Sequence, residues 1–131
     1  MRMPGPFEIH KVVDLEQVVQ APEFLLLDVT GADFRATRTA ADARFTDPAT
    51  RSPVLSFHSY LVRSPAGTLL VDTCVGNHKE RPLIAEWHRR EGDYLARLAA
   101  AGVAPEAVDF VCCTHLHADH CGGNTRLADG R

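Results

Sequence analysis

The chain has 131 residues, of which 45% are hydrophobic and 24% charged, and this composition is that of an ordinary globular protein. Its net charge of −3 gives no electrostatic footprint for nucleic acid, so a nucleic-acid partner is not expected. No apolar run reaches the roughly 18 residues that a membrane-spanning helix requires, which excludes a membrane partner at the level of sequence.

The N-terminal sequence and the cysteines both favour a cytoplasmic protein. Residues 1–6 lack the apolar core of a signal peptide. The cysteines show no paired C-x₂-C spacing and are expected to be free thiols in that compartment: Cys74, Cys112, Cys113 and Cys121. Cys121 is either a small space-filling residue or a redox-sensitive group beside a candidate ligand.

The first third of the chain predicts one strand followed by irregular structure. Apolar residues alternate between Phe7 and Leu15, which predicts a half-buried strand with the odd-numbered side chains facing inward. The apolar run 24–27 is of ambiguous type. Residues 32–53 have no clear periodicity and predict a surface excursion with room for one short helix, which either borders a cleft or only connects two elements.

The middle of the chain carries the clearest β signals. Residues 54–63 and 68–72 are strand-like, and the Pro and Gly between them supply the backbone angles of a tight turn. The sequence therefore predicts a β-hairpin. Asp72 closes its second strand, where a carboxylate is costly to bury without a partner. Asp72 either caps the turn or pairs with a group elsewhere in the fold. In the loop that follows, His78 either faces a substrate pocket or is an ordinary exposed histidine.

Two helices are expected between the hairpin and the next strand. Pro82 suits the first turn of a helix whose apolar face carries three residues, namely Leu83, Ile84 and Trp87. Asp93 is the expected N-cap of a second helix that runs to Ala101, with its core face formed by Leu95, Leu98 and Ala99.

The end of the second helix has the pattern of a Schellman motif. Gly102 follows the last helical residue, and Val103 can pack back on Leu98. Residues 104–107 then turn the chain into a predicted strand over 108–113.

Four potential metal ligands cluster within six residues after this strand: His115, His117, Asp119 and His120. In an extended chain the two histidines of H-x-H leave on the same face, about 6.6 Å apart, and can share one ion. After a turn, the adjacent Asp and His can reach a second ion. Gly122 and Gly123 would let the backbone pass close to the metals. The alternatives are a histidine-rich surface loop without metal, or a structural zinc knuckle.

The motif His115-Leu-His117-Ala-Asp119-His120, followed by Gly-Gly-Asn, resembles the signature of the metallo-β-lactamase-fold hydrolase superfamily. The resemblance implies an α/β (α+β) fold, namely the N-terminal αβ half of an αββα sandwich. Residues 1–131 would then form a single partial domain whose second half is missing. The stretches 74–82 and 124–131 are most similar to the branch of N-acyl-homoserine lactonases and organophosphate hydrolases.

The resemblance also implies a dinuclear zinc site, which iron or manganese would also suit. His115 and His117 would ligate the first ion, and Asp119 and His120 the second. A metal-bound hydroxide would attack a lactone, ester or related bond in a small-molecule substrate, and Asp119 would be catalytic by carrying the proton to the leaving group. In this family an Asp at the position of Asp72 supports the metal-binding loop from behind the ligands. Cys74 stands where the family often has Gly.

The resemblance implies further ligands that these residues do not supply. A complete site would take two more histidines and a bridging Asp, yet no His follows His120 and the only later carboxylate is Asp129. Two other functions are therefore weighed beside the hydrolase. One is a non-catalytic metal-binding or interaction fragment; with either function, a chain without its second half is expected to self-associate through an exposed sheet edge. The other is an iron-dependent oxidoreductase of the same fold.

Overall fold

The computed structural model describes residues 5–36 and 44–127. The chain divides into two compact units, one formed by residues 1–14 with 57–131 and the other by residues 15–56. Asp129 and the rest of residues 128–131, the last four of the stretch 124–131, lie outside the described residues. Within the described ranges, no helix is long and apolar enough to cross a membrane.

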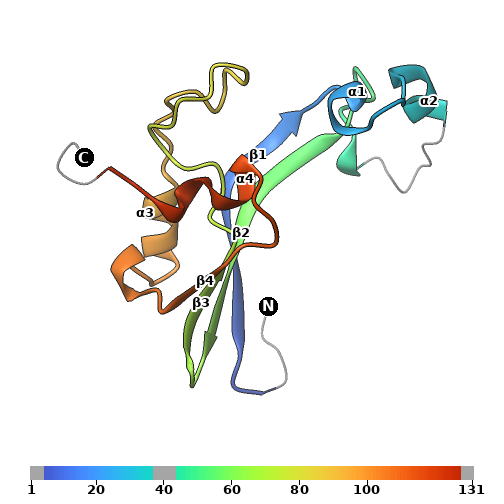
Figure 1. The fold of residues 1–131 in the computed structure, drawn as a ribbon. Helices are drawn as coiled ribbons and strands as arrows, with labels where there is room; N and C mark the ends of the chain where they lie inside the picture. The colour runs from blue at the N-terminus through green and yellow to red at the C-terminus, as the bar shows by residue number, and fades with distance from the viewer. Residues whose placement is uncertain (1–4, 37–43, 128–131) are drawn as a thin grey trace. The chain divides into compact units, whose positions relative to one another are not determined.

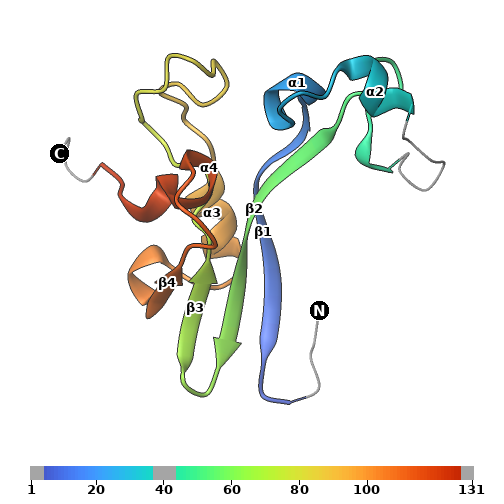
Figure 2. The same cartoon turned by 45° about the vertical axis from the view of Figure 1, so that its right-hand side comes forward.

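A four-stranded sheet organises the fold (Figure 2). Its strands are β1 (Glu8–Val19), β2 (Val54–Ser64), β3 (Gly67–Val71) and β4 (Phe110–Cys112), and they lie in this order across the sheet. β2 and β3 form the predicted antiparallel hairpin, with Leu61 opposite Leu70. β4 joins β3 in parallel, with Leu70 opposite Val111. The expected mixed α/β class is therefore confirmed, although β4 is shorter than the predicted strand 108–113.

One face of the sheet packs against α3 (Tyr94–Ala100) to form the core (Figure 1). Tyr94 and Leu98 lie four residues apart on the same side of this helix and are both buried. Among the described residues, the core cluster is formed by Val12, Leu61, Leu70, Cys74, Tyr94, Leu98 and Val103. The helix between Asp93 and Ala101 was predicted, but its buried face differs from the predicted one. Tyr94 lies on the buried face, whereas Ala99 is exposed.

The helix ends as the sequence indicates. Gly102 has φ +85°, its N–H donates to Ala99 O at 2.8 Å, and the N–H of Val103 donates to Leu98 O at 3.3 Å. These two bonds are those of a Schellman motif. Asp93 does not cap the first turn with its side chain. Its carboxylate lies 3.0 Å from Nε of Arg97 instead.

The buried face of β1 is opposite to the predicted one. Val12 and Asp14 are buried, whereas Phe7 is 47% exposed. The prediction was wrong because it followed the apolar alternation alone, whereas the polar residue Asp14 is buried on the other face together with Val12. Asp14 instead pairs with Arg90 and accepts a hydrogen bond from the Val75 N–H at 3.2 Å. A buried carboxylate with these partners is tolerated in the interior.

The helix predicted from Pro82 does not form, and residues 82–89 make a series of turns. Leu83, expected on its apolar face, is 97% exposed. Backbone bonds across the segment explain the difference, because Arg89 N–H donates to Lys79 O at 2.8 Å and closes residues 79–89 into a loop. Trp87 packs edge-on against Phe57 of β2, with ring centroids 5.4 Å apart.

In the part of the unit 15–56 that the structure describes, the short α-helices are α1 (Pro22–Leu25) and α2 (Gly31–Ala36). The ambiguous apolar run 24–27 therefore begins in a helix, and α2 is the short helix for which the irregular stretch had room. Phe24 and Leu27 are 60% and 91% exposed. Thr46 and Pro53 form an isolated antiparallel bridge.

Replacing Arg90 by Ala is expected to lower the free energy of unfolding by about 3–5 kcal/mol, because it leaves the Asp14 carboxylate buried without its cation. The side chains of Asp14 and Arg90 are only 0% and 12% exposed. Arg97→Ala serves as the control, since its pair with Asp93 is largely exposed and is expected to contribute at most about 1 kcal/mol. Urea unfolding of the three proteins measures both effects. Equal losses of unfolding free energy in the two variants would contradict a stabilising role of the buried pair between Asp14 and Arg90.

Candidate metal centre

The four predicted ligands lie in the segment that follows β4. The chain bends at Thr114 and His115, His117 has an extended backbone, and α4 (Ala118–Cys121) begins directly after His117. The N–H groups of His120 and Cys121 both donate to the carbonyl of His117, at 3.0 and 3.1 Å. The motif is thus folded over one helical turn, and this turn brings its first and last histidines together.

Three imidazole rings gather in this turn. The ring centroids of His115 and His117 are 4.6 Å apart, and those of His115 and His120 are 3.9 Å apart. Asp119 lies beside them, with Oδ2 3.4 Å from Nε2 of His120. The sequence indicated that Asp119 and His120 can reach a second ion after a turn. In the structure the two pairs of side chains are neighbours.

Asp72 lies behind the histidines, at the end of β3. Its Oδ1 accepts a hydrogen bond from the Thr114 N–H at 2.7 Å, and its Oδ2 is 2.8 Å from Nδ1 of His120. Burial acts to raise the pKa of this carboxyl, but the hydrogen bonds from His120 and Thr114 outweigh it, so the pKa lies below its ordinary value. Asp72 is therefore a carboxylate that can orient His120 and anchor the start of the histidine segment.

Cys74 adopts the backbone conformation that usually favours glycine. Both Asp72 and Cys74 have φ +60°, which costs a residue with a Cβ some conformational strain. The Cys74 side chain is fully buried in the core, 3.2 Å from Oγ of Ser59. Burial raises the pKa of this thiol to about 12, so it is an inert core group.

Gly122 and Gly123 approach another backbone. A Cβ on Gly122 would lie less than 3.0 Å from Val75 O, and one on Gly123 less than 3.0 Å from Thr73 O. The Gly122 N–H donates to Cys74 O at 2.9 Å. The two glycines were expected to make room for metals. In the structure, they let the turn after the histidines pack on the loop after β3.

The loop after Asp72 adds contacts that the sequence analysis did not find. Lys79 Nζ donates to Thr125 Oγ1 at 2.6 Å, and the Arg81 guanidinium donates to Val75 O. This guanidinium also lies close to Gly122. No local sequence pattern predicts such contacts. His78 is 41% exposed and lies 3.9 Å from the carboxylate of Glu91.

Two thiols contact the backbone of the histidine segment. Cys113 Sγ lies 3.7 Å from His120 O, and Cys121 Sγ lies 3.5 Å from Leu116 O. Both cysteines are half-buried. These contacts place the thiols around the turn, and the distances are those of weak hydrogen bonds.

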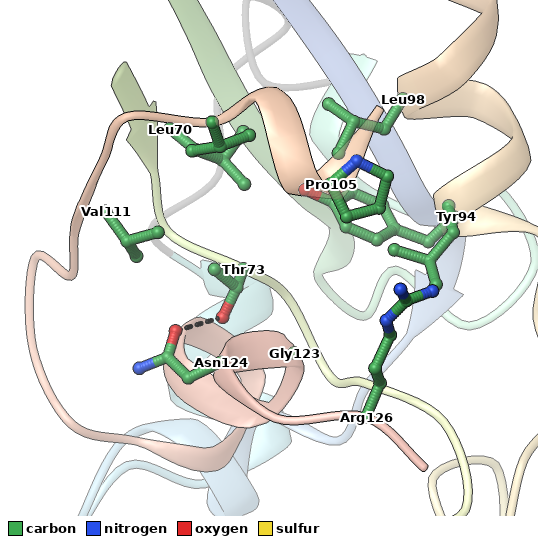
Figure 3. A pocket seen from close by; sticks show the side chains of 11 residues that line it. Leu70, Thr73, Tyr94, Leu98, Pro105, Val111, Gly123, Asn124 and Arg126 are labelled. Carbon is green, nitrogen blue, oxygen red and sulfur yellow. Dashed lines mark hydrogen bonds between the residues drawn. The ribbon is translucent and has the colours of Figure 1, made fainter. Parts of the chain in front are cut away.

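A small apolar pocket of about 180 Å³ lies between α3 and the turn after the histidines (Figure 3). Its walls include Leu70, Leu98 and Val111. At its polar side, Thr73 Oγ1 donates to Asn124 Oδ1 at 2.8 Å. None of the four predicted ligands lines this pocket, so it is separate from the histidine cluster.

The side chains of the three histidines and Asp119 are chemically suited to bind zinc. Imidazole and carboxylate are common zinc ligands, and a ligating histidine commonly donates its other ring N–H to a carboxylate, as His120 can to Asp72. Across residues 5–36 and 44–127, however, no group of three or more His, Cys, Asp or Glu is arranged to hold an ion. The described residues thus bring the rings together and support them without forming such a group.

Replacing Gly122 by Ala is expected to lower the free energy of unfolding by about 1–3 kcal/mol, because the new Cβ meets backbone that cannot move aside cheaply. Gly31→Ala is the matched control. Its Cβ would meet only the side-chain ends of Arg35 and Glu23, and the change should stay within about 1 kcal/mol. Chemical denaturation measures both. A Gly122→Ala protein as stable as the control would show that the two backbones do not touch as described.

Comparison with known proteins gives one family match. Residues 53–130 match the family model described as "Metallo-beta-lactamase superfamily". No curated protein matches the chain.

Several solved structures share the fold. The hydrolase AbOPH "in beta lactamase superfamily" aligns at TM-score 0.68 and 22% identity, over 95% of this chain and 38% of its own. A probable metal-dependent hydrolase from Staphylococcus aureus aligns at TM-score 0.66 and 22% identity, over 95% and 43%. AidC, a dizinc quorum-quenching lactonase solved with the product N-hexnoyl-L-homoserine, aligns at TM-score 0.63 and 21% identity, over 91% and 36%. The chain thus spans about two-fifths of the length of these structures.

Proposed function

Because the chain belongs to the metallo-beta-lactamase superfamily, we propose that it carries metal-binding residues of a zinc-dependent hydrolase that cleaves a lactone, ester or related bond. The observation that carries this proposal is the gathering of His115, His117 and His120 beside Asp119, with Asp72 behind them. The similarity in fold to a dizinc lactonase supports the substrate class.

Each residue of the cluster has a proposed role. His115 and His117 hold the first ion, and Asp119 and His120 the second. Zinc, when bound, supplies the Lewis acid that polarises the scissile carbonyl and activates water. Asp72 fixes the His120 ring through Nδ1 and so directs Nε2 toward the site. Asp119, whose side chain is 19% exposed, is placed to carry a proton to the leaving group.

A second function is supported by the incomplete donor set. The described residues offer no three-donor group, and the chain covers only 38% of the AbOPH chain. A non-catalytic metal-binding or interaction fragment would account for both observations. Zinc-dependent hydrolysis by the 131-residue chain alone would eliminate this alternative.

Replacing His117 by Ala is expected to abolish zinc-dependent hydrolysis of lactone and ester substrates by a polypeptide that carries these residues, because the first ion loses one of its two ligands from this segment. Bound zinc per chain should fall in parallel. His10→Ala is the control, since His10 is an exposed residue of β1. Turnover and zinc content measured together test the assignment. Unchanged turnover in His117→Ala would refute it.

A further inference from the structure

The hydroxyl of Thr114 lies at the centre of the groups that support the histidines. Its Oγ1 is 3.1 and 3.0 Å from the two carboxylate oxygens of Asp72, and 3.2 Å from Nδ1 of both His115 and His120. One hydroxyl thus faces one carboxylate and two imidazoles. A threonine hydroxyl has only one proton to donate, so these contacts restrict where the ring protons can lie.

The protons can be assigned from the acceptors. An ionised carboxylate only accepts hydrogen bonds, so the Thr114 O–H must donate to Asp72. His120 Nδ1 lies closer to Asp72 Oδ2, at 2.8 Å, than to Thr114, so its N–H also serves the carboxylate. Thr114 Oγ1 then keeps lone pairs for His115. If His115 Nδ1 lacked a proton, two lone pairs would face each other.

We infer that Thr114 is a positioning residue, which holds the proton of His115 on Nδ1 and so leaves Nε2 of this ring free as a metal donor. Asp72 thereby fixes the position of the ring proton in two histidines, in His120 directly and in His115 through the Thr114 hydroxyl. The role of Nε2 as a donor rests on the proposed zinc site, whereas the position of the proton is a property of the metal-free chain.

The arrangement explains why a hydroxyl at position 114 matters. A neutral histidine free in water carries its proton mainly on Nε2, which would block that nitrogen as a donor. His115 and Thr114 are both exposed, so burial does not select the other tautomer. The hydrogen bond from Nδ1 to Thr114 is the interaction that selects it.

The test is nitrogen NMR of the ¹⁵N-labelled 131-residue chain, freed of metal and held near pH 8, above the ordinary imidazole pKa of about 6.5. Long-range proton–nitrogen correlations report which ring nitrogen carries the proton, and His115→Gln assigns the signals. We expect the His115 proton on Nδ1 in the wild type and in Thr114→Ser. In Thr114→Val it should move largely to Nε2, and in the control Thr125→Val it should not move.

Zinc affinity gives a second readout. Thr114→Val should weaken zinc binding about 10- to 100-fold, as expected when a group that orients a ligand is lost. Thr114→Ser and Thr125→Val should bind as the wild type does. A merely structural role for Thr114 would not predict rescue by serine of both the tautomer and the affinity.

The outcomes separate the two proposals. A wild-type His115 with its proton on Nε2 overturns the inference, even if Thr114→Val does not fold. A proton on Nδ1 that Thr114→Val leaves in place also overturns it. A proton on Nδ1 that moves as expected, in a chain that binds no zinc, supports the inference and contradicts the proposed hydrolase.

Discussion

The histidine cluster depends on the contact between two stretches of backbone, residues 72–76 after β3 and residues 120–123 after the motif. The N–H of Thr73 donates to His120 O at 2.7 Å, and the N–H of Gly122 donates to Cys74 O at 2.9 Å. Such a close approach leaves no room for a Cβ on Gly122. The position of His120 against Asp72 follows from this backbone contact, because the carbonyl of His120 is itself one of its acceptors.

The loop after β3 is in turn fixed by buried polar groups. The Val75 N–H donates to Asp14, whose other oxygen pairs with Arg90, and the Val75 carbonyl accepts from Arg81. Ser59 Oγ lies 2.6 Å from the hydroxyl of Tyr94 and 3.2 Å from Cys74 Sγ. Burial raises the pKa of the Tyr94 hydroxyl as it does that of the Cys74 thiol, so both side chains stay protonated and serve packing. Satisfied polar groups of this kind favour one arrangement of the core, because leaving any of them unpaired is costly.

Sequence patterns predicted those features of the fold that depend on residues close together in the chain. The turn 64–67 predicted the β2–β3 hairpin, and Gly102 with Val103 predicted the end of α3. The density of ligand types predicted a cluster, and the structure brings the rings together. The buried face of β1 was missed because its reason, the pair between Asp14 and Arg90, joins residues 76 positions apart. The segment after Pro82 was missed because long-range bonds override its apolar spacing.

The remaining contacts of the site could not be predicted from any pattern in the sequence. The hydroxyl of Thr114 acts through partners that only the folded backbone brings near. Asp72 and Thr114 together hold the start of the histidine segment and the His120 ring. A loop whose supports are already in place loses less conformational entropy when an ion binds. Rings on such a loop can thus take up positions around a metal at small entropic cost, which favours metal binding by a motif whose supports are already formed.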